Sequence, residues 1–593
     1  MRRRMAFACA VLAMATAISG TTAMAGGNGG FKTSRPSMLT AVKKGVSVTP
    51  LLTVGDELPN GFRFESIPDG ISVRPVGRGL TDLFINHETS KVPFPFASAT
   101  PSAAGGQSDF DNSQVSQLIV NAAGRVVDGS FAIDSGGGFQ RFCSNFLATS
   151  KEGFDQDVFF TNEESPDYAM RQENSWPPPL SNAGAEENGV VVALDPDTGE
   201  YQTIYGMGRF NHENDVAIPG YDDLVVLSGD DTFTSGTLTL PPGPNLATSA
   251  PAQSQLYSYI ASDTDALLGD DGDLWAFVSD NSSFTDYYDF VPGSTQSITG
   301  HFIKVPKIIA TGKDTDGSEL TSSDLGYPAP DGGWQTDLRT SGPAVPIDGP
   351  QWVLEYWSHL NHVFQFVRVE DLAYDKRPGM GNVVYFADTG RATLPAQPPL
   401  SGPGISTNGR IWKMVLDPDD PTQVDSLSIL LDGDDNPVKT LGEIHQPDNV
   451  ETTSKGLLVS EDPGGNNQFP ANSADPNATT ARLWYVPFAS PNAAQVVAKI
   501  DQSADQGATD VGPSPTPELP FGNWGSWETT GIVDASAAFG TGAYLINIQA
   551  HSLWIEKEAG PDTFIGTDAQ PNDPDFTYKR EGGQLLLIRI PGI

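Results

Sequence analysis

A short apolar run that ends in polar or acidic residues recurs six times along the chain, and this repeat limits the fold more than any other feature. Its copies are DLFINHE (82–88), DVFFTNEE (157–164), DLVVLSGDD (223–231), NVVYFADTG (382–390), GLLVSEDPG (456–464) and AYLINIQAHS (543–552). A second strand-like run follows each copy, and a shorter one precedes most of them. The repeating unit is therefore three or four antiparallel strands joined by tight turns.

Repetition of such a unit around an axis predicts an all-β fold, a six-bladed β-propeller, over residues 71–593. The copies begin about 65 to 90 residues apart, except the third and fourth, which are about 160 residues apart. The Pro-, Gly- and Asp-rich segment 264–350 in that interval is interpreted as an insertion over one face. A pair of stacked β-sandwiches is the structural alternative, which six similar copies disfavour.

The first 25 residues have the pattern of a secretory signal peptide. Arg2, Arg3 and Arg4 precede the apolar stretch MAFACAVLAMATAISG, and Ala23-Met24-Ala25 supplies a small-residue cleavage site. We therefore expect export to the periplasm or the extracellular medium after cleavage near Ala25, by the general or the twin-arginine route. Residues 26–70 are expected to form an N-terminal extension ahead of the propeller.

The charge and the cysteine count exclude several kinds of protein. Cleavage would remove three arginines and leave a formal charge of −43 instead of −40. Such a chain would be repelled by nucleic acid and by anionic membranes. Cys9 belongs to the signal segment and Cys143 then stands alone, so a disulfide framework is excluded. The sequence does not decide the oligomeric state.

Acidic residues recur at one end of the predicted hairpins. In a meander the start of the first strand lies beside the end of the second, so Glu213 should meet Asp230 and Asp231. The same geometry in the other units predicts one channel mouth ringed with carboxylates, which would repel one another unless cations neutralise them. The candidate metal ligands are Glu163, Glu164, Glu213, Glu370, Asp371, Asp448, Glu461 and Asp462. Oxygen-rich ligands favour Ca²⁺ first and Mg²⁺ or Mn²⁺ next, and ordinary turn residues at strand ends are the alternative interpretation.

Other acidic stretches carry a weaker signal. DTDGSE (314–319), GDDGD (269–273) and DGDDN (432–436) resemble fragments of calcium-binding loops. None has the full ligand spacing with a terminal glutamate, so each is interpreted as a surface turn.

Four motifs resemble those of the PhoX-type alkaline phosphatases, which are exported bacterial propeller enzymes. They are GMGRFNHEN (206–214), FVRVEDLAYD (366–375), QPDNVETTSKGLLVSEDPG (446–464) and NEE (162–164). The closing stretches WETTGIVDAS, INIQAHS and EGGQLLLIRI resemble a related phosphatase-like or phytase-like branch, and the resemblance spans about residues 75–593.

The resemblance implies iron and calcium ions at the channel mouth, bound to a phosphoryl group. It implies that Glu213 bridges metals, that Arg368 binds phosphate, and that Glu370 and Asp448 are metal ligands. Glu163 and Glu164 correspond to the paired glutamates of the family. The family's iron-binding cysteine is replaced here by Asn162. The resemblance therefore supports calcium more directly than iron.

The sequence thus leads to one hypothesis and two alternatives. The hypothesis is an exported, calcium-dependent phosphomonoesterase-like propeller that acts on a small phosphate ester, with Arg368 and Glu213 as catalytic residues. One alternative is a non-catalytic, calcium-stabilised propeller that binds a partner or a surface glycan. The other is a lactone or sugar-ester hydrolase, which would use the same acids without needing Arg368 as a phosphate clamp.

Overall fold

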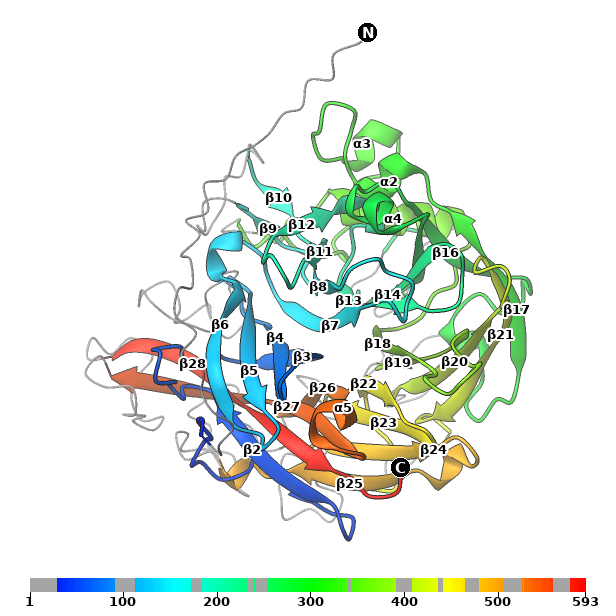
Figure 1. The fold of residues 1–593 in the computed structure, drawn as a ribbon. Coiled ribbons are helices and arrows are strands. Elements are labelled where there is room, and N and C mark those ends of the chain that lie inside the picture. Colours follow the sequence, from blue (N-terminus) through cyan, green and yellow to red (C-terminus); the bar gives the residue numbers. More distant parts are fainter. Residues whose placement is uncertain are drawn as a thin grey trace.

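The structure is a computed structural model, and it is all-β, with several antiparallel sheets arranged around one axis as in a propeller (Figure 1). It describes residues 29–90, 112–171, 184–232, 238–240, 253–339, 343–390, 408–435, 441–463, 479–504, 525, 527–557 and 576–593. The predicted signal peptide lies outside these residues. No helix in the described part of the chain is long and apolar enough to span a lipid bilayer.

The first two sheets have four strands each. In both, the first strand along the chain is the innermost, and each later strand lies farther from the axis. One has the order β3-β4-β5-β6, with β3 (Pro68–Gly77), β4 (Leu80–His87), β5 (Gln114–Asn121) and β6 (Val126–Ile133). The other has the order β7-β8-β11-β12, with β7 (Phe142–Ala148), β8 (Val158–Glu163), β11 (Val191–Leu194) and β12 (Tyr201–Ile204). A small hairpin of β9 (Tyr168–Ala169) and β10 (Glu186–Glu187) leaves the second sheet between β8 and β11.

The third sheet has nine strands in the order β13-β14-β15-β16-β17-β21-β20-β19-β18. One part comprises β13 (His212–Ile218), β14 (Leu224–Asp230), β15 (Leu256–Ala261), β16 (Asp273–Ser279) and β17 (Ser297–Lys304). The other part comprises β18 (Val369–Tyr374), β19 (Val383–Asp388), β20 (Arg410–Leu416) and β21 (Gln423–Asp432). The antiparallel pairing of β17 with β21 joins the two parts at their outer edges.

The last two sheets each take up a strand from the N-terminal part of the chain. The order β1-β25-β24-β23-β22 uses β1 (Leu39–Ala41), β22 (Pro447–Thr452), β23 (Gly456–Glu461), β24 (Arg482–Pro487) and β25 (Gln495–Ile500). The order β2-β28-β27-β26 uses β2 (Ser47–Thr53), β26 (Glu528–Asp534), β27 (Ala543–Lys557) and β28 (Phe576–Arg589). Residues 26–70, expected to be an extension, thus contribute strands to two sheets and include the start of β3.

Segment 264–350 also differs from the expected insertion over one face. It contains β16 and β17, which belong to the nine-stranded sheet. Its other elements are α1 (Thr264–Leu268), α2 (Lys307–Thr311), α3 (Ser322–Leu325) and the start of α4 (Pro350–Leu360). The sequence between β16 and β17 is rich in turn residues and obscures the alternating pattern of the two strands. For this reason both strands were missed in the sequence.

The innermost strands form a closed ring. Strand β3 contacts β7, and the contacts continue in order through β13, β18, β22 and β26, which contacts β3 again. Figure 1 shows these strands around the centre of the molecule. Large apolar clusters fill the space between neighbouring sheets, and side-chain hydrogen bonds between the innermost strands, such as those of Asp371 with Asn214 and Val450, add to this packing.

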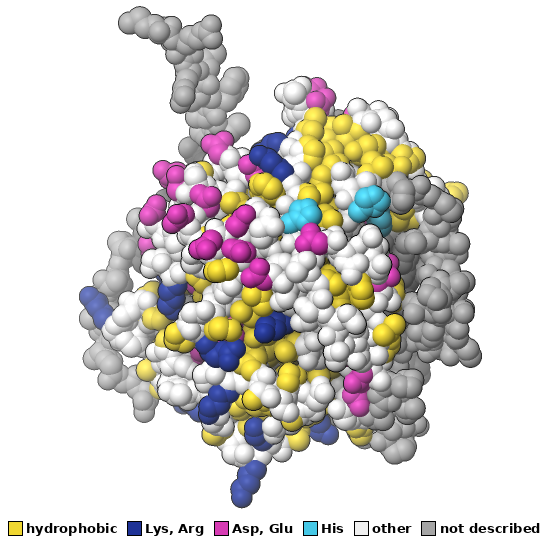
Figure 2. Space-filling model, turned by 90° about the vertical axis from the view of Figure 1, so that its right-hand side faces the viewer, with side chains coloured by type: hydrophobic (Ala, Val, Ile, Leu, Met, Phe, Trp, Pro, Cys, Tyr) yellow, Lys and Arg dark blue, Asp and Glu magenta, His cyan; other side chains and the backbone are white. Residues whose placement is uncertain are grey.

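The charge of the chain is unevenly distributed on its surface. On the side face drawn in Figure 2, acidic side chains gather at the upper left and basic ones lie mainly in the lower half. Other acidic side chains, among them Asp69, Glu213 and Glu370, are buried.

Candidate metal centre

The same irregularity interrupts all six innermost strands near their starts. In each, the register with the next strand shifts across two residues, as a β-bulge does. A bulge turns a side chain away from its regular direction. The first bulged residue is Asp69 in β3, Cys143 in β7, Glu213 in β13, Glu370 in β18 and Asp448 in β22. Five bulges therefore bring a carboxylate or a thiol to one end of the axis.

The second strand of several sheets delivers another acid to the same end. Glu88 follows β4, Glu164 follows β8, and Asp231 follows β14. Side chains alternate along a strand, so the residue just before each of these points elsewhere. This alternation separates Glu164 from its neighbour Glu163.

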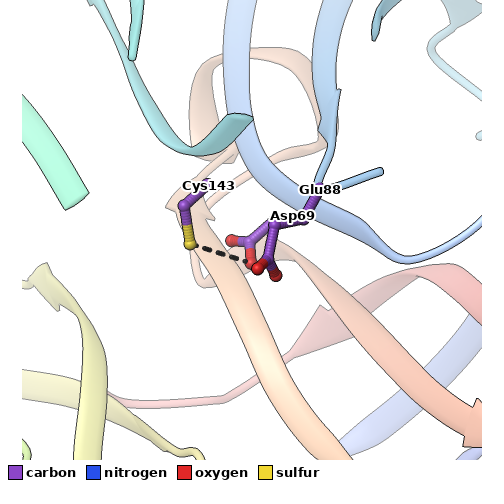
Figure 3. Close-up of side chains that lie close together, drawn as sticks. All are labelled: Asp69, Glu88 and Cys143. Carbon is purple, nitrogen blue, oxygen red and sulfur yellow. Dashed lines mark hydrogen bonds between the residues drawn. The ribbon is translucent and has the colours of Figure 1, made fainter. Parts of the chain in front are cut away.

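These residues come together in four overlapping groups, in each of which the possible ligand atoms lie within 4.8 Å of one another. The groups are Asp69–Glu88–Cys143, Cys143–Glu164–Glu213, Glu164–Asp231–Glu370 and Glu213–Glu370–Asp448. We call these eight residues the acidic cluster. In Figure 3 the Cys143 sulfur points at the Asp69 carboxylate, with Glu88 beside it, and the Sγ–Oδ2 distance is 3.4 Å.

One arginine lies against the acidic cluster. The Nε and Nη2 atoms of Arg368 donate to the two carboxylate oxygens of Asp231, at 2.8 and 2.7 Å. Nη2 also lies 3.0 Å from Glu370. The fork geometry of a guanidinium suits any planar or tetrahedral oxyanion in this position.

Burial and mutual repulsion shift the pKa values in the acidic cluster. Burial raises the pKa of Asp69 to about 6. It raises the pKa of Glu213 and Asp448 well above the usual range, and Glu370 adds to both shifts. Burial also raises the pKa of Glu370, although Arg368 opposes this. The pKa of the Cys143 thiol rises well above its usual value through burial and the nearby Asp69. Such a site gains most from cations, which replace the protons.

Of the sequence-predicted residues, Glu164, Glu213, Glu370 and Asp448 are brought together, whereas three others are held elsewhere. Glu163 accepts from Arg171 Nη2 at 2.8 Å and from the backbone N–H groups of Gln140 and Gly189. Alternation along β8 is the physical reason: Glu163 faces away from Glu164.

Glu461 and Asp371 also serve as structural anchors outside the acidic cluster. Glu461 accepts from Arg482 Nη2 at 2.7 Å and from Trp484 Nε1 at 2.8 Å. Asp371 is the second bulged residue of β18, and it accepts from the Asn214 side chain and from the Val450 N–H. These residues pin neighbouring segments together, which explains why acids at strand ends are not all ligands.

Asp462 lies close to the acidic cluster without entering one of its groups. Burial is the main cause of the raised pKa values of Glu370 and Asp448, and the charge of Asp462 raises both values further. Its buried Oδ1 atom has no hydrogen-bond partner among the described residues. The Asp462 carboxylate could therefore ligate a cation at the edge of the acidic cluster.

The ligand set predicted from the sequence does not contain Asp69, Glu88 or Cys143, and it places Asp231 beside Glu213 without naming it as a ligand. Asp69 fell in the segment expected to be an extension, and Cys143 stands on the strand before the motif examined for an iron ligand. The available signal was positional, because Cys143 and Glu213 each begin the bulge of a first strand.

No protein-family model matches the chain, and no curated protein matches it. Among solved structures, it is similar to Pseudomonas fluorescens PhoX in complex with vanadate, a transition state analogue. The match has a TM-score of 0.52 and 15% sequence identity, and it covers 94% of this chain and 98% of that one. The two chains share a fold. A PQQ-bound aldose sugar dehydrogenase from Streptomyces coelicolor also matches, at a TM-score of 0.30 and 10% identity, over 92% of this chain and 98% of that one.

Proposed function

We propose that the protein is an exported, metal-dependent phosphoesterase that hydrolyses small phosphate esters at the acidic cluster. The observation that carries the proposal is the contact of Arg368 with two acids of that cluster, Asp231 and Glu370. This arrangement offers a cation for phosphoryl oxygens directly beside a set of metal-ligating groups. The shared fold with a PhoX that binds a transition state analogue supports the proposal.

The donors of the acidic cluster fit two kinds of ion. Glu213, Glu370 and Asp448 offer only oxygen, which suits Ca²⁺. The groups that include Cys143 offer a sulfur ligand as well, which would suit iron despite Asn162. The buried Oε2 atom of Glu213 has no hydrogen-bond partner among the described residues, so it is free to ligate. When bound, such ions polarise phosphoryl oxygens and acidify a bound water.

The residues of the chain orient the ester and exclude water. Arg368 would hold two phosphoryl oxygens through its Nε and Nη2 atoms once the substrate displaces Asp231. Glu213, buried and held by the Ser144 hydroxyl at 3.0 Å, keeps its carboxylate fixed against Glu370 and Asp448. A fixed, buried arrangement of charges stabilises negative charge that develops on the phosphoryl group.

Hydrolysis of p-nitrophenyl phosphate by the purified protein tests the proposal. The protein is stripped with a chelator and then given Ca²⁺, Fe or both, and its metal content is measured by elemental analysis. We expect turnover that depends on added metal and falls at least about 100-fold in Arg368→Ala, since a buried contact to developing charge is worth about 3 kcal/mol. Glu200→Gln, an exposed acid, is the matched control. Absence of metal-dependent turnover over a range of phosphate esters would reject the proposal.

A second candidate is a calcium-stabilised propeller that binds a partner without catalysis. The observation in its favour is that the Arg368 guanidinium already forms an ion pair with Asp231. This candidate predicts that Ca²⁺ raises the melting temperature, that no phosphate ester is hydrolysed, and that Arg368→Ala leaves partner binding unchanged.

We also propose that the nine-stranded sheet comprises two blades joined by the β17–β21 pairing, which gives six blades in all. The ring of innermost strands supports this count. We propose export because residues 1–25 have the sequence pattern of a secretory signal peptide.

A further inference from the structure

A cavity of about 520 Å³ lies apart from the acidic cluster, between the β9–β10 hairpin and the segment that carries α2 and α3. None of its lining residues belongs to the acidic cluster. Its polar lining includes Tyr168, Glu186, Lys313, Glu319 and Asp348. The volume is within the range of small-molecule sites.

The acids of the cavity wall already have partners: two are paired with cations, and the third is held by hydrogen bonds. Glu186 lies 3.4 Å from Arg171 and 3.6 Å from Lys313. Glu319 lies 2.9 Å from Arg209 and 3.7 Å from the same lysine. Burial opposes ionisation of Glu186, yet Arg171 and Arg209 hold its pKa at about 2. Asp348 accepts from the N–H and hydroxyl of a serine, at 2.8 Å each. An added ion of either sign would therefore find its counter-charges taken.

The DTDGSE loop beside the cavity does not offer a calcium site in its present form. Asp314 Oδ1 accepts from the N–H of Thr315, and Asp316 Oδ1 accepts from the N–H and hydroxyl of Ser318. These are the contacts of a closed turn. The interpretation of this loop as a surface turn therefore agrees with its hydrogen bonds.

The hydroxyl of one largely buried tyrosine faces a lining residue of the cavity. Tyr168 is 4% exposed, lines the cavity, and lies with its hydroxyl against Gly349, another lining residue. No described residue is hydrogen-bonded to that hydroxyl, while Arg339 stacks on the ring at 3.7 Å. Polar groups of a cavity wall normally have a hydrogen-bond partner, so a ligand hydroxyl that supplies one to Tyr168 is favoured.

We propose that this cavity binds a neutral, hydroxyl-rich ligand of the sugar or polyol class. Hydroxyl groups both donate and accept, so they can bind paired carboxylates, Lys313 and the Tyr168 hydroxyl without disturbing the charge balance. The site goes beyond the proposed phosphoesterase activity and needs no metal. Arg171 links the wall of the cavity to the strand that ends beside the acidic cluster, because it contacts both Glu186 and Glu163, which precedes Glu164.

The test is equilibrium binding of glucose, gluconate and glucosamine to the full chain by isothermal titration calorimetry, without phosphate and with chelator. The three probes are similar in size and differ in charge. We expect saturable binding of glucose and at least about tenfold weaker binding of the two charged probes. Tyr168→Phe should weaken glucose binding about two- to tenfold, the value of one neutral hydrogen bond.

Lys307→Met is the matched control, because Lys307 is an exposed, ion-paired lysine outside the cavity. It should leave the affinity for glucose unchanged, whereas Lys313→Met should reduce it. Melting curves establish that each variant is folded, and Lys313→Met decides the matter if Tyr168→Phe does not fold. Three results would overturn the proposal: tighter binding of a charged probe, no saturable binding of glucose, or unchanged affinity in both folded cavity variants. Because no phosphate ester is used, failure here leaves the phosphoesterase proposal untouched.

Discussion

At the scale of single residues, two adjacent glutamates of the NEE motif have opposite roles. Glu164 belongs to the acidic cluster, and Glu163 neutralises Arg171. We expect Glu163→Gln to lower the free energy of unfolding by about 3 kcal/mol, because the buried Arg171 loses the nearer of its two carboxylate partners and keeps only Glu186 at 3.4 Å. Glu164→Gln should retain or raise stability in the metal-free protein and lose bound metal. Denaturant unfolding and elemental analysis of both variants check this, and equal effects of the two changes on stability would contradict it.

His87 should make the stability of the fold depend on pH. It is fully buried between Ser66 O and the Ser116 hydroxyl, and burial lowers the pKa of its imidazole from 6.5 to about 4. The neutral ring therefore contributes stability that is present above pH 6.5 and is lost as the pH falls from 6.5 to 4, by up to about 3 kcal/mol. Unfolding of wild type and His87→Gln across this range should show a difference that shrinks toward acid. A difference that is independent of pH would show that folding does not lower the pKa of His87.

At the scale of elements, the sequence predicts strands well and bulges poorly. The meander pairings were predictable, since the start of β13 does lie opposite Asp230, and the start of β22 opposite Glu461. A bulge adds a residue without changing the apolar pattern, so alternation alone could not say that Glu370 points into the acidic cluster while Asp371 does not. Asp69 was missed because the short apolar run of β3 precedes the first recognised repeat.

Strand β24 carries an Arg-x-Trp clamp on the acid that ends β23, because Arg482 and Trp484 both donate to Glu461. In β20 only the tryptophan makes the equivalent contact: Trp412 Nε1 lies 3.4 Å from Asp388, whereas Arg410 donates to Asp432 at 3.1 Å. We expect Glu461→Gln to destabilise the protein by about 3 kcal/mol and the double change with Arg482→Met to recover part of this loss. A double-mutant cycle measured by denaturant unfolding checks it. Purely additive losses would mean that the clamp is not a coupled pair.

At the scale of the whole molecule, the N-terminal strands β1 and β2 complete sheets whose other strands come from the C-terminal part of the chain. Leu52 in β2 is fully buried and pairs with Leu585 of β28, while Ser47 on the same strand is exposed. Leu52→Asp should abolish cooperative folding, because it loses about 2 to 3 kcal/mol of apolar burial and buries an unpaired charge. Ser47→Asp, the control, should change stability by no more than about 0.5 kcal/mol. Similar melting of the two variants would show that β2 does not contribute to the stability of its sheet.

The acidic cluster joins acids from several sheets, so its cations should stabilise the whole ring and not one sheet. Burial raises the pKa of Asp69 to about 6 in the absence of metal, and the other cluster carboxylates shift in the same direction. Protonated carboxylates stabilise the metal-free fold below about pH 4, and this contribution is lost as the pH rises through about 6. A bound cation removes that loss, because it favours the ionised carboxylates. The melting temperature with Ca²⁺ should therefore exceed that with chelator by an amount that grows between pH 5 and pH 8. In Asp448→Asn the growth should be smaller, since one ionisable ligand is gone, whereas a Ca²⁺ effect that is constant with pH would place the ion outside the acidic cluster.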